Sequence, residues 1–462
     1  MKLIHERVHD YALRNPEKPA LIDERGEMTY RELDARSAQA AAALAARGAK
    51  PGDRAAVYVP YTKDILLGAV SVLRAGCVFV PFDDAYPVER LQYMLRDSEA
   101  AAILTLRELW EKKKPDFPAE KVIFLDEICP GACIGAGEIP PADESAFVSP
   151  SLTAASPAML LYTSGTTGNP KGVLHTHNML LHIVDWIKVH PDAAMNADTR
   201  SGAMSSFSFV GTQMFLLGPL LHGGTVCIAP EAARKDLTLL GQFLREYRVT
   251  HMFLPSGLAA ILAEDYDIRG RFLFAAGEKL RNFRPLCPGS FLINSYGSTE
   301  LSGVLSKKVY GDEDVITVGK CWKNTRVRLA DEKGNPTAPG EPGELLVSSS
   351  FMARRYYGLP ELSREKWVRM DGRLWFRTGD RAVCNPEGDW VLLGRTDNMV
   401  KLRGFRIETG EVETQIARAA RKLGRDDVTQ PVVTVKTVCG TDHLCCYYEG
   451  FELYRACKML QI

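Results

Sequence analysis

A glycine- and hydroxyl-rich segment directly after a short apolar run constrains this chain more than any other feature. Residues 159–162 read MLLY, which is typical of a buried strand, and residues 163–172 read TSGTTGNPKG. Glycines permit dihedrals that point successive backbone N–H groups at one anion, the hydroxyls add donors, and Lys171 supplies a full charge. The segment therefore predicts a phosphate-binding loop. Its spacing from Gly165 to Lys171 fails G-x-x-x-x-G-K-[ST], which argues against a P-loop NTPase.

The loop resembles the phosphate signature of the AMP-forming adenylating superfamily and, within it, the amino-acid adenylation domains of non-ribosomal peptide synthetases. The likeness covers nearly the whole chain in the family's motif order, at residues 28–34, 73–87, 158–177, 204–229, 295–300, 343–349, 375–382 and 390–413. It implies a ligase that uses ATP and Mg2+ to join a small carboxylic acid to AMP, with release of pyrophosphate. The phosphopantetheine thiol of an acyl or peptidyl carrier protein, or of coenzyme A, would then take the acyl group.

Composition argues against a net attraction to nucleic acid or membranes, leaves local charged patches open, and excludes little else. Lysine plus arginine and aspartate plus glutamate each total 57, so no net field draws the chain to nucleic acid or to a membrane surface. The sequence has no run of 18 apolar residues and no signal-peptide core, so we expect a cytoplasmic protein. Eleven cysteines are scattered without metal spacing or a disulfide framework. At 462 residues, two or three domains are expected.

The order of apolar and helical segments predicts an α/β fold. Apolar runs at residues 20–22, 54–60, 77–81 and 101–104 alternate with helical segments, as in strand-helix-strand units around a parallel sheet. Thr29 and Glu32 have the spacing of a capping box for a helix that ends at Gly48. Residues 105–157 read as a surface connection. Residues 204–229 predict a buried helix leading into a strand, and residues 272–276 and 290–294 predict two further strands.

Two domains are expected, a large multi-layer N-terminal domain with parallel-type sheets (residues 1–395) and a small, shortened α+β C-terminal domain (residues 396–462). The resemblance puts a hinge between them at Asp397. Beyond it, a helix with an apolar face and a strand pair at 431–438 and 443–448 are predicted. The residues of that apolar face are Val412, Ile416, Ala419, Ala420 and Leu423.

The resemblance also assigns the residues of the reaction site. The segment at 295–300 offers a flat aromatic ring, hydroxyls and a carboxylate at a strand end, groups suited to a base, an oxyanion and a hard cation. Tyr296 would face the adenine and Asp380 the ribose hydroxyls, for which a carboxylate is a suitable acceptor. The implied catalytic residues are Thr163, Lys171, Thr299, Glu300 and Lys401, with Glu300 as the Mg2+ ligand. The implied nucleotide contacts are Thr163, Ser164, Gly165, Thr166, Thr167, Gly168, Lys171, Gly277, Glu278, Ser295, Tyr296, Gly297, Ser298, Thr299, Asp380 and Arg395.

The pocket for the acid is expected to be uncharged. Ser208 stands where the family has an aspartate that pairs with the ammonium of an amino acid, and a buried unpaired cation is costly. We therefore expect a neutral hydroxy, keto, aryl or short acyl acid rather than an ordinary α-amino acid. The implied pocket residues are Phe207, Ser208, Phe209, Thr212, Gly257, Phe274, Ala276, Ser295, Gly303 and Val304.

The family's last motif carries a lysine that bridges the acid and the phosphate, and residues 425–462 contain no counterpart. Lys458 lacks the glycine-lysine turn of that motif. The chain as written is therefore expected to adenylate slowly, whereas thiol transfer, which uses residues 401–404, should suffer less. Two alternatives stay open, an AMP-forming acyl-CoA ligase and a nucleotide-binding remnant that no longer catalyses.

Overall fold

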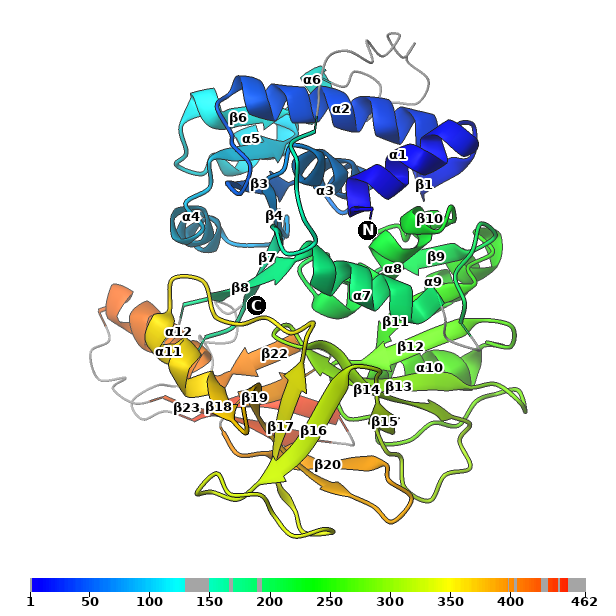
Figure 1. Ribbon diagram of the computed structural model, residues 1–462, viewed down its shortest axis with the longest axis vertical. Helices are drawn as coiled ribbons and strands as arrows, with labels where there is room; N and C mark the ends of the chain where they lie inside the picture. Colours follow the sequence, from blue (N-terminus) through cyan, green and yellow to red (C-terminus); the bar gives the residue numbers. More distant parts are fainter. Residues whose placement is uncertain are drawn as a thin grey trace.

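The computed structural model describes residues 2–128, 149–165, 169–188, 193–397, 399–402, 405–424, 431–438 and 441–447. Figure 1 shows the first three helices at one end of the molecule and a later antiparallel sheet, between residues 325 and 395, at the other. Two larger, mostly parallel sheets lie between these ends. The chain is thus an α/β protein, as the alternation of apolar and helical segments predicts.

The first large sheet has six strands in the order β6-β5-β3-β4-β7-β8. Its neighbours are parallel except β7 and β8, an antiparallel pair connected by the predicted phosphate loop. The strands are β3 (Arg54–Tyr58), β4 (Val78–Phe82), β5 (Ala102–Thr105), β6 (Val122–Phe124), β7 (Pro157–Thr163) and β8 (Lys171–Thr176). The helices between them are α3 (Asp64–Arg74), α4 (Val88–Asp97), α5 (Arg107–Lys113), η1 (Ala119–Lys121) and α6 (Leu125–Ile128).

The second large sheet has nine strands in the order β15-β14-β13-β12-β11-β9-β10-β1-β2. The strands from β13 to β1 in this order are parallel, and antiparallel strands close both edges. The strands are β1 (Pro19–Asp23), β2 (Gly26–Thr29), β9 (Arg200–Ala203), β10 (Thr225–Ile228), β11 (His251–Pro255), β12 (Phe272–Ala276), β13 (Leu292–Ser298), β14 (Ser302–Val309) and β15 (Lys320–Cys321). The helices that accompany them are α7 (His177–Lys188), α8 (Val210–Leu221), α9 (Leu237–Glu246) and α10 (Ser256–Asp265).

One continuous core joins the two large sheets. It contains buried side chains of both sheets and of α1 (Ile4–Arg14), α2 (Tyr30–Ala46), α3 and α8. Helix α2 begins with the predicted capping box, in which Thr29 N–H donates to Glu32 Oε2 (2.7 Å) and Glu32 N–H donates to Thr29 Oγ1 (3.2 Å). Gly48, at φ +83°, follows the end of this helix in the left-handed region that glycine tolerates.

The third sheet is antiparallel, in the order β16-β17-β19-β18 with β20 paired to β19. Its elements are β16 (Thr325–Ala330), β17 (Gly343–Ser349), α11 (Pro360–Lys366), β18 (Trp367–Met370), β19 (Arg373–Cys384) and β20 (Trp390–Arg395). After it come two hairpins and a helix, β21 (Met399–Leu402), β22 (Phe405–Glu408), α12 (Thr409–Lys422), β23 (Val432–Val438) and β24 (Thr441–Tyr447). Strand β20 therefore ends at the predicted domain boundary, and the predicted strand pair at the C-terminal side is confirmed.

Three expectations about the fold need correction. The apolar run at 20–22 forms β1, which pairs with β10 and β2 in the nine-stranded sheet, whereas the other three runs form β3, β4 and β5 of the six-stranded sheet. Residues 105–157 are not only a surface connection, because Val122 and Ile123 are buried in β6; residues 129–148 of that stretch lie outside the described residues. In the predicted apolar face of α12, Ala420 is buried, but Ala419 is exposed, and Leu423 follows the helix with 53% of its surface exposed.

Among the described residues, no helix has the length and apolar character that a membrane crossing requires.

Candidate active site

The carboxyl ends of two parallel strands, one from each large sheet, meet at the candidate site. β7 ends at Thr163, and β13 ends at Ser298, just before Thr299 and Glu300. In open α/β sheets, ligands bind outside the carboxyl ends of the strands. The loop after β7 and the segment after β13 are the two segments for which the sequence predicts phosphate and metal binding.

The phosphate loop returns to the sheet at Lys171, which pairs with Thr163 across the β7–β8 ladder. Gly165 is required here, because a Cβ at that position would lie 2.2 Å from the carbonyl oxygen of Asn169. Thr166, Thr167 and Gly168, predicted to contact the nucleotide, lie outside the described residues. Among the described residues, the buried hydroxyl of Thr163 has no hydrogen-bond partner.

Lys171 is buried beside charged and aromatic groups. Its side chain is 4% exposed, its Nζ lies 3.8 Å from Glu408 Oε1, and the same atom lies 4.8 Å from the centre of the Tyr356 ring. Burial lowers the pKa of Lys171, and the nearby Arg406 guanidinium lowers it further. The predicted phosphate-binding cation therefore faces a carboxylate of the C-terminal segment.

Glu300 is fully buried and its carboxylate is engaged on both oxygens. Tyr356 Oη donates to Oε1 (2.7 Å), and Arg406 Nη1 donates to Oε1 (3.0 Å) and Oε2 (3.2 Å). Burial raises the pKa of Glu300, but Arg406 and Lys171 outweigh it and hold the pKa well below its usual range. The predicted Mg2+ ligand is thus a permanent negative charge that is paired with Arg406 in this arrangement.

Gly297 allows β13 and β14 to come close where the site is formed. A Cβ on Gly297 would lie 1.8 Å from the carbonyl oxygen of Ser302, and the β13–β14 register shifts between Tyr296 and Gly297. Strand β13 runs through Tyr296 to Ser298, so the first four residues of the motif belong to the strand, contrary to the predicted strand end at 294, and Thr299 and Glu300 follow it. Ser298 has a buried hydroxyl without a partner among the described residues.

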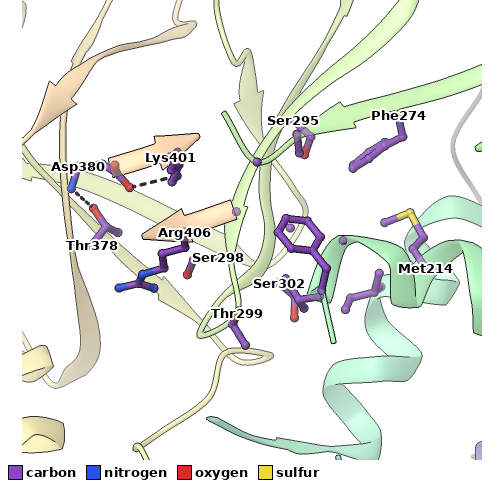
Figure 2. A pocket seen from close by; sticks show the side chains of 18 of the residues that line it. Met214, Phe274, Ser295, Ser298, Thr299, Ser302, Thr378, Asp380, Lys401 and Arg406 are labelled. Atoms are coloured by element: carbon purple, nitrogen blue, oxygen red, sulfur yellow. Dashed lines mark hydrogen bonds and ion pairs between the residues drawn. The ribbon is translucent and has the colours of Figure 1, made fainter. Parts of the chain in front are cut away.

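Asp380, on β19, is the centre of a second group of charges, seen beside Lys401 in Figure 2. Its Oδ2 accepts a hydrogen bond from Tyr296 Oη (2.6 Å), and its Oδ1 accepts one from Arg395 Nη1 (2.7 Å). Lys401 Nζ lies 4.0 Å from Oδ2. Arg395 also donates to both oxygens of Asp397, at 2.6 and 2.7 Å. The structure therefore brings together four residues with different predicted roles: Asp380 for the ribose, Tyr296 for the adenine, Lys401 for catalysis and Arg395 for the nucleotide. The predicted hinge residue Asp397 joins this group through Arg395.

The ring of Tyr296 is buried and does not offer an exposed face on which adenine could stack. Its side chain is 3% exposed, and Lys401 Nζ is 5.4 Å from the centre of its ring. Burial lowers the pKa of Lys401, while the Asp380 carboxylate raises it. In the arrangement described, the polar end of Tyr296 is held by Asp380.

A cavity extends from these charges to an apolar end, with Phe274 and Met214 on the side opposite Asp380 and Lys401 (Figure 2). The predicted pocket residues that line it are Phe209, Phe274, Ala276, Ser295 and Gly303. Gly277, Gly297, Ser298, Thr299, Asp380, Arg395 and Lys401 line it as well. The acid pocket and the nucleotide residues therefore share one cavity.

Five predicted pocket residues do not line this cavity. Ser208 Oγ instead donates to the carbonyl oxygen of Pro81 (3.4 Å), and Thr212 Oγ1 donates to that of Ser206 (3.1 Å). Phe207 packs against Tyr61, with ring centres 4.7 Å apart. The other two are Gly257, whose N–H donates to Glu278 Oε1 (3.0 Å), and Val304, which is buried in a separate apolar cluster. Glu278, a predicted nucleotide contact, therefore binds the backbone of α10.

Sequence reasoning missed several residues of the site. Arg406 and Tyr356 bind Glu300, and Trp322 lines the apolar end of the cavity. Arg406 stands in the predicted eighth motif, only five residues after Lys401, which is a signal that could have found it. Tyr356 and Trp322 lie outside every predicted motif.

Comparisons with known proteins agree on one family. The model of a family described as AMP-binding enzyme matches residues 8–357. Tyrocidine synthase 2 of Brevibacillus parabrevis is 32% identical over 455 residues, which cover 96% of this chain and 12% of the synthase. Surfactin synthase subunit 1 of Bacillus subtilis (strain 168) is 33% identical over 427 residues, which cover 90% of this chain and 11% of that subunit. The chain thus spans about a tenth of the length of these relatives.

Solved structures share the fold. An artificially fused adenylation–PCP di-domain from Klebsiella oxytoca has a TM-score of 0.80 at 22% identity, covering 97% of this chain and 88% of that one. The o-succinylbenzoate CoA synthetase of Bacillus subtilis has a TM-score of 0.79 at 21% identity, and the match covers 96% of this chain and 88% of that one. A four-domain nonribosomal peptide synthetase bound to AMP and glycine has a TM-score of 0.74 at 25% identity, covering 99% of this chain and 33% of that one.

Proposed function

Because the chain belongs to the AMP-binding enzyme family, we propose that it joins a carboxylic acid to the adenylyl group of ATP. An oxygen of the acid would form a bond to the α-phosphorus, the bond from that phosphorus to the bridging oxygen of the β-phosphate would break, and pyrophosphate would leave. The observation that carries the proposal is the convergence of Lys171 and Glu300 on one buried cluster at the strand ends. Phosphoryl transfer depends on such pre-positioned charges more than on a protein nucleophile.

We place the nucleotide beside the described residues that still have unused hydrogen-bond donors or acceptors. The hydroxyls of Thr163 and Ser298, which are without partners among the described residues, would donate to phosphate oxygens beside Lys171. Asp380 already accepts two hydrogen bonds, but a carboxylate has about four acceptor positions. The remaining positions would accept the ribose hydroxyls.

Glu300 fits a Mg2+ ligand, because its oxygens are hard donors and already hold a cation, the Arg406 guanidinium. When bound there, Mg2+ would offset the charge of the phosphates. Arg406 and the ion would contact the same two oxygens. Arg406 must therefore withdraw before Glu300 can hold a metal ion.

We also propose that the described arrangement belongs to the second half of the reaction. Glu408 lies 3.8 Å from Lys171, and the backbone N–H of Gly165 acts to lower the pKa of Glu411, so that carboxylate also lies beside the phosphate loop. These carboxylates stand where the pyrophosphate end of ATP would need cations and N–H groups. Thiol transfer needs the acyl-adenylate but no pyrophosphate: the sulfur would bond to the acyl carbon and AMP would leave. Rotation of residues 396–462 about Asp397, relative to the large domain of residues 1–395, would exchange the two arrangements.

The acid itself is proposed to be uncharged apart from its carboxylate. Among the described residues that line the cavity, Asp380 is the one acidic side chain, and it is paired with Arg395 and Lys401. An α-ammonium group in the apolar end would have no carboxylate partner, and a buried unpaired cation is costly. A neutral hydroxy, keto, aryl or short acyl acid fits better.

Pyrophosphate release with ATP and a panel of acids tests the proposed function. We expect neutral acids to exceed all proteinogenic amino acids, and Lys171→Ala to lower the rate on the order of 100- to 1000-fold. A proteinogenic amino acid that exceeds every neutral acid would show that the assignment of the acid is wrong. Absence of pyrophosphate release with every acid would favour a nucleotide-binding protein that does not catalyse.

The thiol acceptor separates the two candidate enzymes. An AMP-forming acyl-CoA ligase shares the first half-reaction, and one solved structure of similar fold is a CoA synthetase. We expect faster thioester formation with a carrier protein bearing phosphopantetheine than with coenzyme A. The reverse preference would identify the acyl-CoA ligase.

A further inference from the structure

Trp322 closes the apolar end of the cavity and is fixed in position from two directions. It follows β15 and precedes β16, and its side chain is 4% exposed and lines the cavity. Its Nε1–H donates to Ser306 Oγ (2.9 Å), and its backbone N–H donates to the carbonyl oxygen of Val304 (2.9 Å). Both partners belong to β14, so the indole is anchored to the sheet that forms the site.

Aromatic neighbours hold the plane of the Trp322 ring. Trp186 of α7 stacks on it, with ring centres 3.9 Å apart and planes at 7°. Phe274, another residue of the cavity wall, meets it edge-on at 6.5 Å and 67°. Offset stacks and edge-to-face pairs are the arrangements that aromatic rings prefer. Trp322 is therefore a stiff wall that an entering molecule cannot easily push aside.

Gly303 explains how the indole reaches the cavity. A Cβ on Gly303 would lie 1.9 Å from Cη2 of Trp322 and 2.3 Å from Cζ3, far inside contact distance. The resemblance places Gly303 on the wall of the acid pocket. The structure sets the indole against that wall, so the glycine makes space for Trp322.

We propose that Trp322 is the end wall of the acid pocket and sets the length of the acid that the chain accepts. The acid is a short, uncharged one, whose single ring or short chain packs against Trp322 and Phe274. A longer acid would collide with an indole that is held by Ser306 and Trp186. This inference rests on the proposed function, and it adds a specificity-determining residue outside every motif that the sequence offers.

The test compares long and short acids in wild type and variants. The probes are benzoic acid against 4-phenylbenzoic acid and butanoic acid against decanoic acid, each measured as kcat/KM in ATP–pyrophosphate exchange. Trp322→Ala should raise the ratio of long to short acid by about tenfold or more, since pockets discriminate small differences in apolar size by 10- to 200-fold. The KM for ATP should not change. Trp322→Leu, which keeps more of the buried volume, should shift the ratio in the same direction by less.

Trp375 provides the matched control, because it is also buried but lies on β19 away from the cavity, with its Nε1–H donating to the carbonyl oxygen of Met370 (3.2 Å). Trp375→Leu should leave the ratio at the wild-type value. Titration of the folded Trp322→Ala chain with 4-phenylbenzoic acid by calorimetry, without ATP, should show binding that wild type lacks. An unchanged ratio and no gain in binding would overturn the inference while the proposed function stands. A wild type that exchanges no pyrophosphate with any acid would overturn both.

Discussion

Glu300 and Arg406 form a buried ion pair between the segment after β13 and the C-terminal segment, and Arg406→Ala removes its cation. Glu300 is fully buried, and the Arg406 side chain is 20% exposed. Removing one partner of a buried pair costs about 3 to 5 kcal/mol, because the other charge is left uncompensated. Tyr356 Oη still donates to Glu300, and Lys171 still acts on it. We therefore expect a loss near the lower end, about 3 kcal/mol.

Mg2+ should reverse this loss. The ion can take the place that the guanidinium leaves, and a ligand at 100 times its Kd stabilises the folded state by about 2.7 kcal/mol. In thermal unfolding, the Tm of the Arg406→Ala chain should lie below that of wild type in EDTA and approach it as Mg2+ is added. Wild type should respond less, because Arg406 competes for the same oxygens.

Arg377→Ala is the matched control for this experiment. Arg377 pairs with Glu344 at 3.0 and 2.5 Å, but its side chain is 40% exposed and it lies outside the cavity lining. Glu344 is itself buried but keeps a hydrogen bond from the Gly379 N–H, so Arg377→Ala should also lower stability, but without Mg2+ dependence. Equal Mg2+ responses of wild type and the Arg406→Ala chain would refute the reasoning that Arg406 occupies a cation position on Glu300.

Three further predictions follow from single side chains. Asp380→Ala should weaken ATP binding by about tenfold or more in calorimetry, since a hydrogen bond to a charged group contributes about 1.5 to 3 kcal/mol; equal affinities would remove the ribose assignment. Tyr356→Phe deletes the donor to Glu300 Oε1 and should lower the free energy of unfolding by about 1 to 3 kcal/mol; chemical denaturation with an unchanged midpoint would contradict this. Burial lowers the pKa of His5 and of His177 to about 4, so the unfolded chain binds protons that the folded chain does not, and stability should fall as the pH drops from about 6.5 to 4. His177→Phe should reduce that slope of Tm against pH, and an identical slope would argue against it.

Local sequence signals predicted the helices and strands of the fold, but not which strands belong to which of the two large sheets. The capping box of Thr29 and Glu32, the apolar runs and the buried helix α8 all depend on neighbours within a few residues, and all are confirmed. Besides β2, strand β1 pairs with β10, which is far away in the sequence. Periodicity carries no information about such pairing, because both candidate sheets would bury the same apolar run.

The same distinction separates the site residues that sequence reasoning found from those it missed. Lys171, Glu300 and Asp380 stand in motifs with recognisable composition, and the structure brings all three to one cavity and its adjoining charge cluster. Trp322 reaches its place through hydrogen bonds to β14 and a stack on α7. The prediction that five further residues line the pocket is wrong for a related reason. A motif fixes which strand or helix carries a residue, but the hydrogen bonds of Ser208 and Thr212 to nearby carbonyl groups decide where their side chains point.

In the proposed reaction, charge balance gives a reason for the position of strand β22. In the proposed first half-reaction, Mg2+ compensates Glu300 and the phosphates compensate Lys171; departure of the metal ion and pyrophosphate would leave a buried anion and a buried cation without partners. Strand β22 carries Arg406 and Glu408 two residues apart, a spacing that puts both side chains on one face of a strand. Arg406 meets Glu300 at 3.0 Å and Glu408 meets Lys171 at 3.8 Å. One strand therefore supplies both missing charges at once.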